Sequence, residues 1–219
     1  MWKPPFISDW VAEDRCHLSG LTFKEGEARY VTGFSQTNKA DAWQQEREGS
    51  GFVMDIKTNE VVCTGLSQPN SPRWYQDKLW LLNAGTGEFG CVDVEKKVFN
   101  PIALCQGYAQ SLTFCGNFAL IAVSLKSQGK GLVSTKLASK LAEQKLSPMC
   151  GMQWVDLRTG QSAAAFLAEG IIEEISGISV LANTHMPKLI GFKNDEIYRY
   201  MAFDRDAVGA VSRLNTSIN

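Results

Sequence analysis

Polar side chains recur at equivalent positions in four separate segments of this sequence. The segments read HLSGLTF, QPNSPRW, YAQSLTF and EISGISV, and in each of them two polar residues two positions apart open a strand-like run. The eight residues are His17, Ser19, Gln68, Asn70, Tyr108, Gln110, Glu174 and Ser176. If the four segments surround a common axis, these side chains form a polar ring, which either binds a small polar ligand or only hydrates a narrow channel.

Metal chemistry is a second possibility at this ring. The imidazole of His17 and the carboxylate of Glu174 or Glu173 are donor types that bind transition metals. Asn70 and Gln110 would then orient the substrate of a metal-assisted hydrolase or isomerase. The chain contains 2 histidines, which excludes a three-histidine centre from one chain. No motif calls for a metal or another cofactor, and whether the chain is an enzyme stays open at this point.

A glycine motif raises the question of nucleotide binding. The spacing Gly85-x-Gly87-x-x-Gly90 matches a dinucleotide-binding turn, which requires a helix directly after the glycines so that its first amides bind the pyrophosphate. Here residues 91–99 alternate apolar and polar side chains around a short polar turn, which predicts a strand, a turn and a second strand. We therefore interpret the motif as a glycine-rich hairpin.

Cysteine chemistry is not expected either. Cys16 precedes His17, but adjacent residues of a strand point to opposite faces, so the two side chains would not pair as nucleophile and base. The six cysteines form no C-x-x-C pair, and most lie in apolar runs: Cys16, Cys63, Cys91, Cys105, Cys115 and Cys150. This pattern predicts reduced, packed thiols.

Three hairpin-like segments reveal an internal repeat. GFVMDIKTNEVVCTGL, GCVDVEKKVFNPIAL and MQWVDLRTGQSAAAFL each contain an apolar run that ends in aspartate, a polar turn and a second apolar run. Asp55, Asp93 and Asp156 occupy equivalent positions, where a carboxylate can accept hydrogen bonds from turn amides. We expect these aspartates to be structural.

The repeat predicts an all-β, propeller-like fold in one domain that covers residues 1–219. Units of about 40 residues with four short antiparallel strands are typical of propeller blades. About four blades are expected near residues 20–66, 71–104, 111–167 and 175–212. A short amphipathic helix is expected within 132–146, inserted between strands of the third blade.

Composition limits the partners. With 22 basic and 23 acidic residues the net charge is −1, and no basic stripe is present, so neither nucleic acid nor a membrane surface is an expected partner. No apolar run reaches the ~18 residues of a membrane-spanning helix, and the N-terminus lacks a signal-peptide pattern. A cytoplasmic location is the default expectation. The polar segment 38–51 is expected to be an exposed loop, with Trp43 available to a partner.

Four stretches carry a resemblance to a known family. WKPPFIS with EDRCHLSGL, SQPNSPRW, WVDLRTG and the closing EEISG with LIGFKNDEI are similar to the bacterial family called domain of unknown function 4915. The resemblance covers nearly the whole chain and implies a propeller-like fold without an established activity. Similar members have a further N-terminal region, long enough for two or three blades of about 40 residues each. They often have His where this chain has Asn70, and Asn where it has Ser19.

The end faces of such an arc must be covered, because open faces leave apolar side chains and strand edges exposed. Residues 2–7 are one candidate, as a closing strand in which Pro4 and Pro5 suit an edge position. A homodimer that buries the same faces is another, and a shortened family member is a third. The expected function is a binding module that recognises a protein, a peptide or a small polar ligand at the channel mouth, and the metal-assisted enzyme is the alternative.

Overall fold

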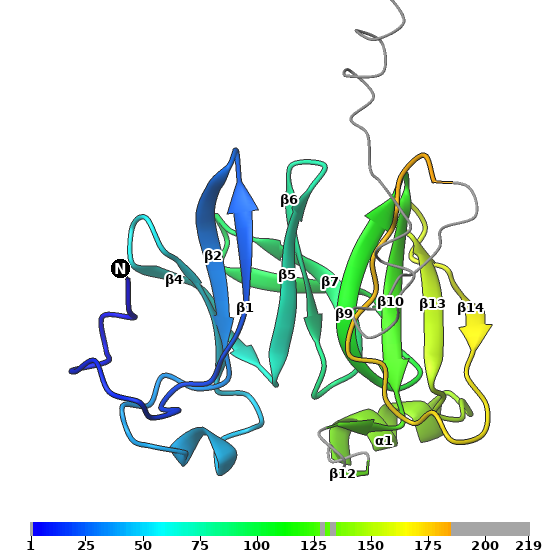
Figure 1. Ribbon diagram of the computed structural model, residues 1–219, viewed down its shortest axis with the longest axis horizontal. Helices are drawn as coiled ribbons and strands as arrows, with labels where there is room; N and C mark the ends of the chain where they lie inside the picture. Colours follow the sequence, from blue (N-terminus) through cyan, green and yellow to red (C-terminus); the bar gives the residue numbers. More distant parts are fainter. Residues whose placement is uncertain (1, 128–129, 132–134, 185–219) are drawn as a thin grey trace, which may run out of the picture. The chain divides into compact units, whose positions relative to one another are not determined.

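Residues 2–127, 130–131 and 135–184 are described by the computed structural model, and they form an all-β fold (Figure 1). The first sheet has the order β1-β2-β3-β4, with strands Leu18–Lys24, Glu27–Gly33, Gly51–Asp55 and Glu60–Leu66. The second has the order β5-β6-β7-β8, with strands Pro69–Tyr75, Lys78–Asn83, Glu88–Asp93 and Val98–Leu104. The third has the order β14-β13-β10-β9, with strands Ser162–Leu167, Gly151–Asp156, Phe118–Ser124 and Tyr108–Cys115. All pairings within these sheets are antiparallel.

Alternating side chains of β6 show how the three sheets pack. Leu79 and Leu81 belong to a core cluster with residues of the first sheet, such as Val53. Trp80 and Leu82 point to the opposite face of the same strand and join a cluster with residues of the third sheet. The second sheet is therefore buried on both faces, between the first sheet and the third.

The first strands of the sheets lie side by side, as Figure 1 shows for β1, β5 and β9. Side chains link each one to the next. The Thr22 hydroxyl on β1 accepts the amide hydrogen of Trp74 on β5 at 3.1 Å, and the Ser71 hydroxyl on β5 donates to the carbonyl of Gln110 on β9 at 3.0 Å. We call β1, β5 and β9 the inner strands.

The expected helix is present as α1, Thr135–Glu143, which lies between β10 and β13 in the chain. Its Leu137 and Leu141 are buried, as the spacing of the apolar residues predicted. A two-stranded ribbon, β11 (Lys126–Ser127) and β12 (Lys130–Gly131), precedes it. A short 3-10 helix, Ala42–Gln44, is the only other helix in the described part of the chain.

The glycine motif forms the predicted hairpin between β6 and β7. Gly87 has a φ of 70°, and a Cβ there would lie 2.4 Å from Cδ1 of Leu137 on α1. A Cβ on Gly90 would lie 2.1 Å from the carbonyl oxygen of Asn100 on the neighbouring strand. These glycines therefore permit close packing of α1 and β8, and the helix of a nucleotide-binding turn does not follow them.

The three repeated aspartates hold turns, as expected. Each ends the third strand of its unit in chain order, and a carboxylate oxygen accepts an amide of the following turn. The donors are Lys57 to Asp55 at 2.9 Å, Lys96 to Asp93 at 2.9 Å and Arg158 to Asp156 at 2.8 Å. Asp55 is buried and also pairs with Arg29, whose nitrogen lies 2.7 Å away.

Residues 2–7 do not form the closing strand that the prolines suggested. They contain a turn in which the amide of Ile7 donates to the carbonyl of Pro4 at 3.0 Å. Their side chains, and not their backbone, cover the free face of the first sheet: Trp2 and Phe6 pack on the cluster of Val31, Phe52 and Met54. Two prolines leave too few amides for a strand ladder, so this segment works as an apolar cover.

The chain divides into two units, Met1–Val180 and Leu181–Asn219. The fourth blade predicted at 175–212 falls across them. Its described part, 175–184, contains no strand, and the amides of Ile175 and Ile178 donate to the hydroxyls of Ser124 on β10 and Ser111 on β9. The remainder, 185–212, lies outside the described residues. Within the described part, no helix is long and apolar enough to span a bilayer.

Candidate functional site

The predicted polar ring is occupied by contacts between inner strands. Tyr108 donates its hydroxyl hydrogen to Oε1 of Gln68 at 3.0 Å, and both side chains are buried. Gln110 donates from Nε2 to Oε1 of Glu174 at 2.9 Å. These side chains join neighbouring segments to each other.

Ser19 and Asn70 share one geometry. The Ser19 hydroxyl on β1 donates to the carbonyl of Pro69 on β5 at 2.5 Å, and Nδ2 of Asn70 donates to the carbonyl of Ala109 on β9 at 3.0 Å. Pro69 directly precedes Asn70, the residue on β5 that is equivalent to Ser19. Ala109 directly precedes Gln110, the equivalent residue on β9. Oδ1 of Asn70 is fully buried without a hydrogen-bond partner in the described part of the chain.

His17 lies apart from the other predicted ring residues. Its Nδ1 is 2.6 Å from Oδ2 of Asp14, and its ring stacks on Trp43 with 4.0 Å between centroids and on Phe34 with 4.5 Å. Its φ of 48° is close to the 50° of Gln68, so the two residues predicted to be equivalent do share a left-handed backbone at the start of an inner strand. The imidazole, however, turns toward Asp14 and Trp43.

The metal alternative finds no matching cluster. Among the described residues, no three His, Cys, Asp or Glu side chains lie close enough together to bind a metal ion. His17 is joined to Asp14, whereas Glu174 is joined to Gln110. The carbonyl of Glu173 accepts the amide of Leu125 at 2.9 Å, which holds this segment against the end of β10.

Trp43 is buried, with 6% of its surface exposed, so the expectation of an exposed contact residue is wrong. The indole packs between aromatic rings: it stacks on His17 and meets Phe34 edge-on at 5.5 Å. An indole gains free energy when its large apolar surface is removed from water by stacking, which favours the buried position of Trp43 over an exposed one. Trp43 therefore anchors the loop that precedes β3 to the start of β1.

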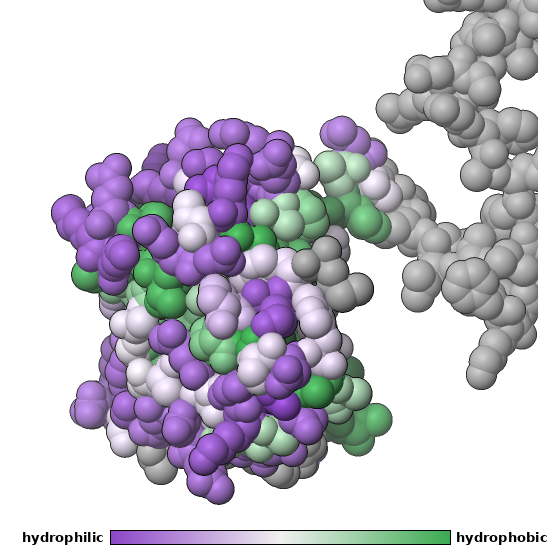
Figure 2. Space-filling model, turned by 90° about the vertical axis from the view of Figure 1, so that its left-hand side faces the viewer, coloured by the Kyte–Doolittle hydropathy of each residue, from purple (hydrophilic) through white to green (hydrophobic). Residues whose placement is uncertain are grey.

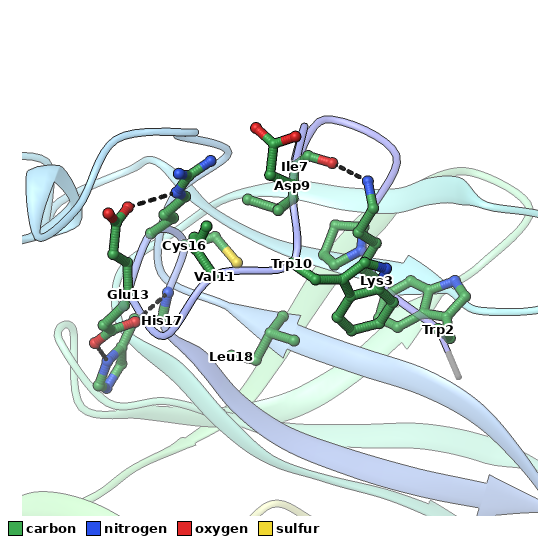
Figure 3. A pocket seen from close by; sticks show the side chains of 13 residues that line it. Trp2, Lys3, Ile7, Asp9, Trp10, Val11, Glu13, Cys16, His17 and Leu18 are labelled. Carbon is green, nitrogen blue, oxygen red and sulfur yellow. Dashed lines mark hydrogen bonds and ion pairs between the residues drawn. The ribbon is translucent and has the colours of Figure 1, made fainter.

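A pocket of about 310 Å³ lies beside the start of β1 (Figure 3). Residues of the N-terminal segment form its walls, and Leu18 at the first position of β1 points into it. Three apolar side chains of this pocket are exposed: Trp10 at 59%, Leu18 at 46% and Val11 at 45%. Figure 2 shows apolar side chains among polar ones on the face that is on the left in Figure 1.

Paired charges form the rim of this pocket. Nε of Arg15 lies 2.8 Å from Oε2 of Glu13, and Asp14 pairs with His17 (Figure 3). Nζ of Lys3 donates to the carbonyls of Ile7 and Ser8. These contacts fix the N-terminal segment in place and leave an apolar recess with a polar edge.

Cys16 contributes no nucleophile to this pocket. Burial, with the negative charge of Asp14 as a smaller cause, raises the pKa of its thiol to about 11. In Figure 3 the sulfur points away from the His17 ring, in agreement with the expectation that the two side chains take opposite directions. The thiol is therefore protonated near neutral pH and behaves as a packed apolar group.

Sequence reasoning found His17 but missed the pocket around it. The signal was present in PPFISDWVAEDRC, where Trp10 and Val11 stand in a polar segment without strand periodicity. Isolated large apolar residues outside any regular pattern indicate either a cover for another surface or a contact site. Which of the two applies depends on what the segment packs against.

The fold and this pocket define an all-β protein with an apolar recess at the edge of its first sheet. The chain belongs to the family described as Domain of unknown function (DUF4915), whose sequence model matches residues 1–190. No curated protein matches the chain.

Among solved structures, the computationally designed Ika4 protein is similar at 13% identity and a TM-score of 0.45, over 80% of this chain and 86% of that one. The computationally designed Ika8 protein is similar at 12% identity and a TM-score of 0.42, over 76% of this chain and 41% of that one.

Proposed function

We propose that this chain is a propeller-like module that recognises a polypeptide segment at the pocket beside the start of β1. The three sheets would be consecutive blades, and residues 175–212 would supply the fourth. This arrangement is supported by sheets that stack face to face and by inner strands that lie side by side. The position of the segment around residue 175 supports this order: the amide of Ile175 donates to the hydroxyl of Ser124 on β10 at 2.9 Å, and the amide of Ile178 donates to the hydroxyl of Ser111 on β9.

One observation carries the binding proposal: Trp10, Val11 and Leu18 are exposed together around one recess of about 310 Å³. Large apolar side chains at a concave site stabilise a complex most when a partner removes them from water. A pocket of about 300 Å³ is at the lower end of ligand-site volumes and holds one or two large side chains. The charged rim gives such a site its orientation, as polar rims do in protein interfaces.

A polypeptide segment suits this pocket better than a small polar ligand does. Small polar ligands are held by convergent hydrogen-bonding groups, but the polar side chains of the rim, Arg15, Lys3 and His17, already contact Glu13, backbone carbonyls and Asp14. The polar residues of the inner strands are likewise engaged with one another. Among the described residues no cluster of metal-binding side chains supports the metal-assisted enzyme.

The test uses minimal apolar side-chain probes, N-acetyl-leucine amide and N-acetyl-tryptophan amide, titrated into isotope-labelled protein and followed by NMR. We expect concentration-dependent shifts at the Trp10 indole and at the amides of Val11 and Leu18. Trp10→Ala should abolish these shifts, whereas Val98→Ala, at an exposed apolar position on β8, should leave them unchanged. Shifts scattered over the surface, or undiminished in Trp10→Ala, would overturn the proposal.

A further inference from the structure

The inner strands are joined by a relation that repeats along the chain. Ser19 on β1 donates to the carbonyl of Pro69 on β5, and Asn70 on β5 donates to the carbonyl of Ala109 on β9. In both pairs, the accepting carbonyl belongs to the residue directly before the position on the next strand that is equivalent to the donor. A strand placed before β1 by the same relation would therefore donate to the carbonyl of Leu18, the residue directly before Ser19.

The start of the series is open at β1. Leu21 is 42% exposed, although its cross-strand neighbours Val31 and Met54 on the same face are buried. Trp2 and Phe6 cover that face over β2 and β3, so the inner edge at Leu18 and Leu21 is left uncovered. The pocket of Figure 3 occupies this uncovered edge.

The end of the series is open at residues 171–178. Several contacts fasten this segment to the third sheet and its end: Gln110 on β9 to Glu174, Ile175 to Ser124, and the amide of Ile178 to the Ser111 hydroxyl at 3.1 Å. Ser176, which the sequence repeat makes equivalent to Ser19, is exposed. Ile171 is 98% exposed, so this end also presents unpartnered apolar surface.

We propose that these two ends bind each other between two copies of the chain. Residues 171–178 of one copy lie against β1 of the second, with the Ser176 hydroxyl directed at the Leu18 carbonyl and isoleucine side chains over the pocket. This inference rests on the proposed function, since it names a second copy as the polypeptide that the pocket recognises. Within the described part of unit Met1–Val180 both ends are exposed, so in these residues segment 171–178 does not lie on the β1 edge of its own chain.

Symmetry favours a closed pair. The contact joins two different surfaces, so it leaves one end of each kind free unless the two copies are related by a two-fold axis. With that axis, the end of each copy covers the start of its partner, and both apolar edges are buried at once. The complex is then a ring of two arcs, which removes the open faces that a single arc exposes.

Crosslinking distinguishes this arrangement from closure within one chain. Leu21→Cys and Ser176→Cys are made in separate chains in a Cys115→Ser background, which removes the exposed native thiol, and are treated with a bismaleimide linker. We expect a product of twice the chain mass only when the two single variants are mixed. In the double variant we expect the same dimeric product. A crosslinked product of single-chain mass, or no product from the mixture, would overturn the inference.

Light scattering during gel filtration provides the second measurement. The wild-type protein is expected at twice the chain mass, and Leu21→Arg is expected as a folded monomer with an unchanged circular dichroism spectrum. Because the partner's isoleucines occupy the pocket in the dimer, the apolar amide probes should bind Leu21→Arg at lower concentration than they bind the wild type. Val98→Arg, an equal change at an exposed position away from both ends, should remain dimeric. A monomeric wild type that still binds the apolar amide probes would refute the dimer but not the pocket, whereas a dimer that survives Leu21→Arg would also refute this interface.

Discussion

Nδ1 of His17 lies 2.6 Å from the carboxylate of Asp14, and the imidazole ring stacks on the indole of Trp43. A second bond joins the same residues, from the amide of His17 to Oδ1 of Asp14 at 3.0 Å. The amide of Asp41 also donates to the carbonyl of Asp14 at 2.8 Å. His17 therefore connects the N-terminal segment, the start of β1 and the loop before β3.

Removing the imidazole should loosen this junction. His17→Ala is expected to lower the free energy of unfolding by about 1–2 kcal/mol, because it removes one side-chain hydrogen bond and an aromatic stack. His17→Phe retains the stack and should cost less than His17→Ala. Urea unfolding measures the loss, and the NMR signal of the Trp43 indole should shift most in His17→Ala. Equal stabilities for both variants would show that the stack contributes nothing.

Helix α1 is attached to the glycine hairpin through Glu88. Burial by itself raises the pKa of this carboxyl, but hydrogen bonds from Lys140, Thr86 and Asn83 and the charge of Lys140 outweigh it and hold the pKa below its ordinary value. The carboxylate therefore contributes stability above pH 4.5, which is lost as the pH falls through its lower folded pKa.

Lys140→Met should remove most of that contribution. We expect a loss of about 1 kcal/mol at pH 7, a modest figure because the pair is partly exposed to solvent. The loss should shrink as the pH falls through the lowered folded pKa of Glu88, because the protonated carboxyl no longer pairs with Lys140. Urea unfolding at pH 7 and below that folded pKa measures it, with Lys145→Met at an exposed position of the same segment as the control. A loss that does not change with pH would contradict the assigned role of the ion pair.

Glycine is required at position 87 for two reasons. Its φ of 70° is unfavourable for residues with a Cβ, and a Cβ there would clash with a methyl group of Leu137. Gly87→Ala should therefore lower the free energy of unfolding by about 2–3 kcal/mol. Gly116, with a φ of 55° and no atom within 4 Å of its Cβ position, separates the two causes. Gly116→Ala should cost about 1 kcal/mol, from the backbone alone. Thermal unfolding compares the two variants. Equal losses of stability in Gly87→Ala and Gly116→Ala would mean that α1 moves away from the added Cβ without a cost in free energy.

The buried thiols should react slowly and in a predictable order. Burial raises the pKa of Cys105 to about 12, with the charge of Glu88 as a smaller cause, and burial raises the pKa of Cys63 to about 11. Because the thiolate is the reactive form, iodoacetamide at pH 8 should first modify Cys115, which is exposed. Peptide mass spectrometry over time reports the order. Early modification of Cys105 in the folded protein would contradict this account of its environment.

The same thiol makes stability depend on alkaline pH. Since the folded pKa of Cys105 lies above the ordinary 9.0, its contribution is complete below pH 9 and is lost as the pH rises toward 12. Cys105→Ala should therefore lose less stability than the wild type between pH 8 and pH 10.5. Thermal unfolding at these two pH values measures the difference.

Local patterns in the sequence predicted the strands of the three four-stranded sheets and the helix α1. The Asp55, Asp93 and Asp156 turns, the glycine hairpin and the apolar stripe of α1 depend on residues that are neighbours along the chain. Contacts of this kind follow from periodicity and turn chemistry, and for that reason they could be predicted. The equivalence of His17 and Gln68 at the starts of inner strands was also visible, and their shared positive φ agrees with it.

Only the tertiary structure decided what these residues do. A periodic pattern specifies which side of a strand is apolar, but it does not specify which surface will meet that side. Trp43, which was expected to be exposed, is therefore buried against His17, and Tyr108 bonds to Gln68. Residues 2–7 cover a sheet with side chains where a strand was expected, and together with residues 9–17 they line the recess at Leu18, which no sequence pattern predicts.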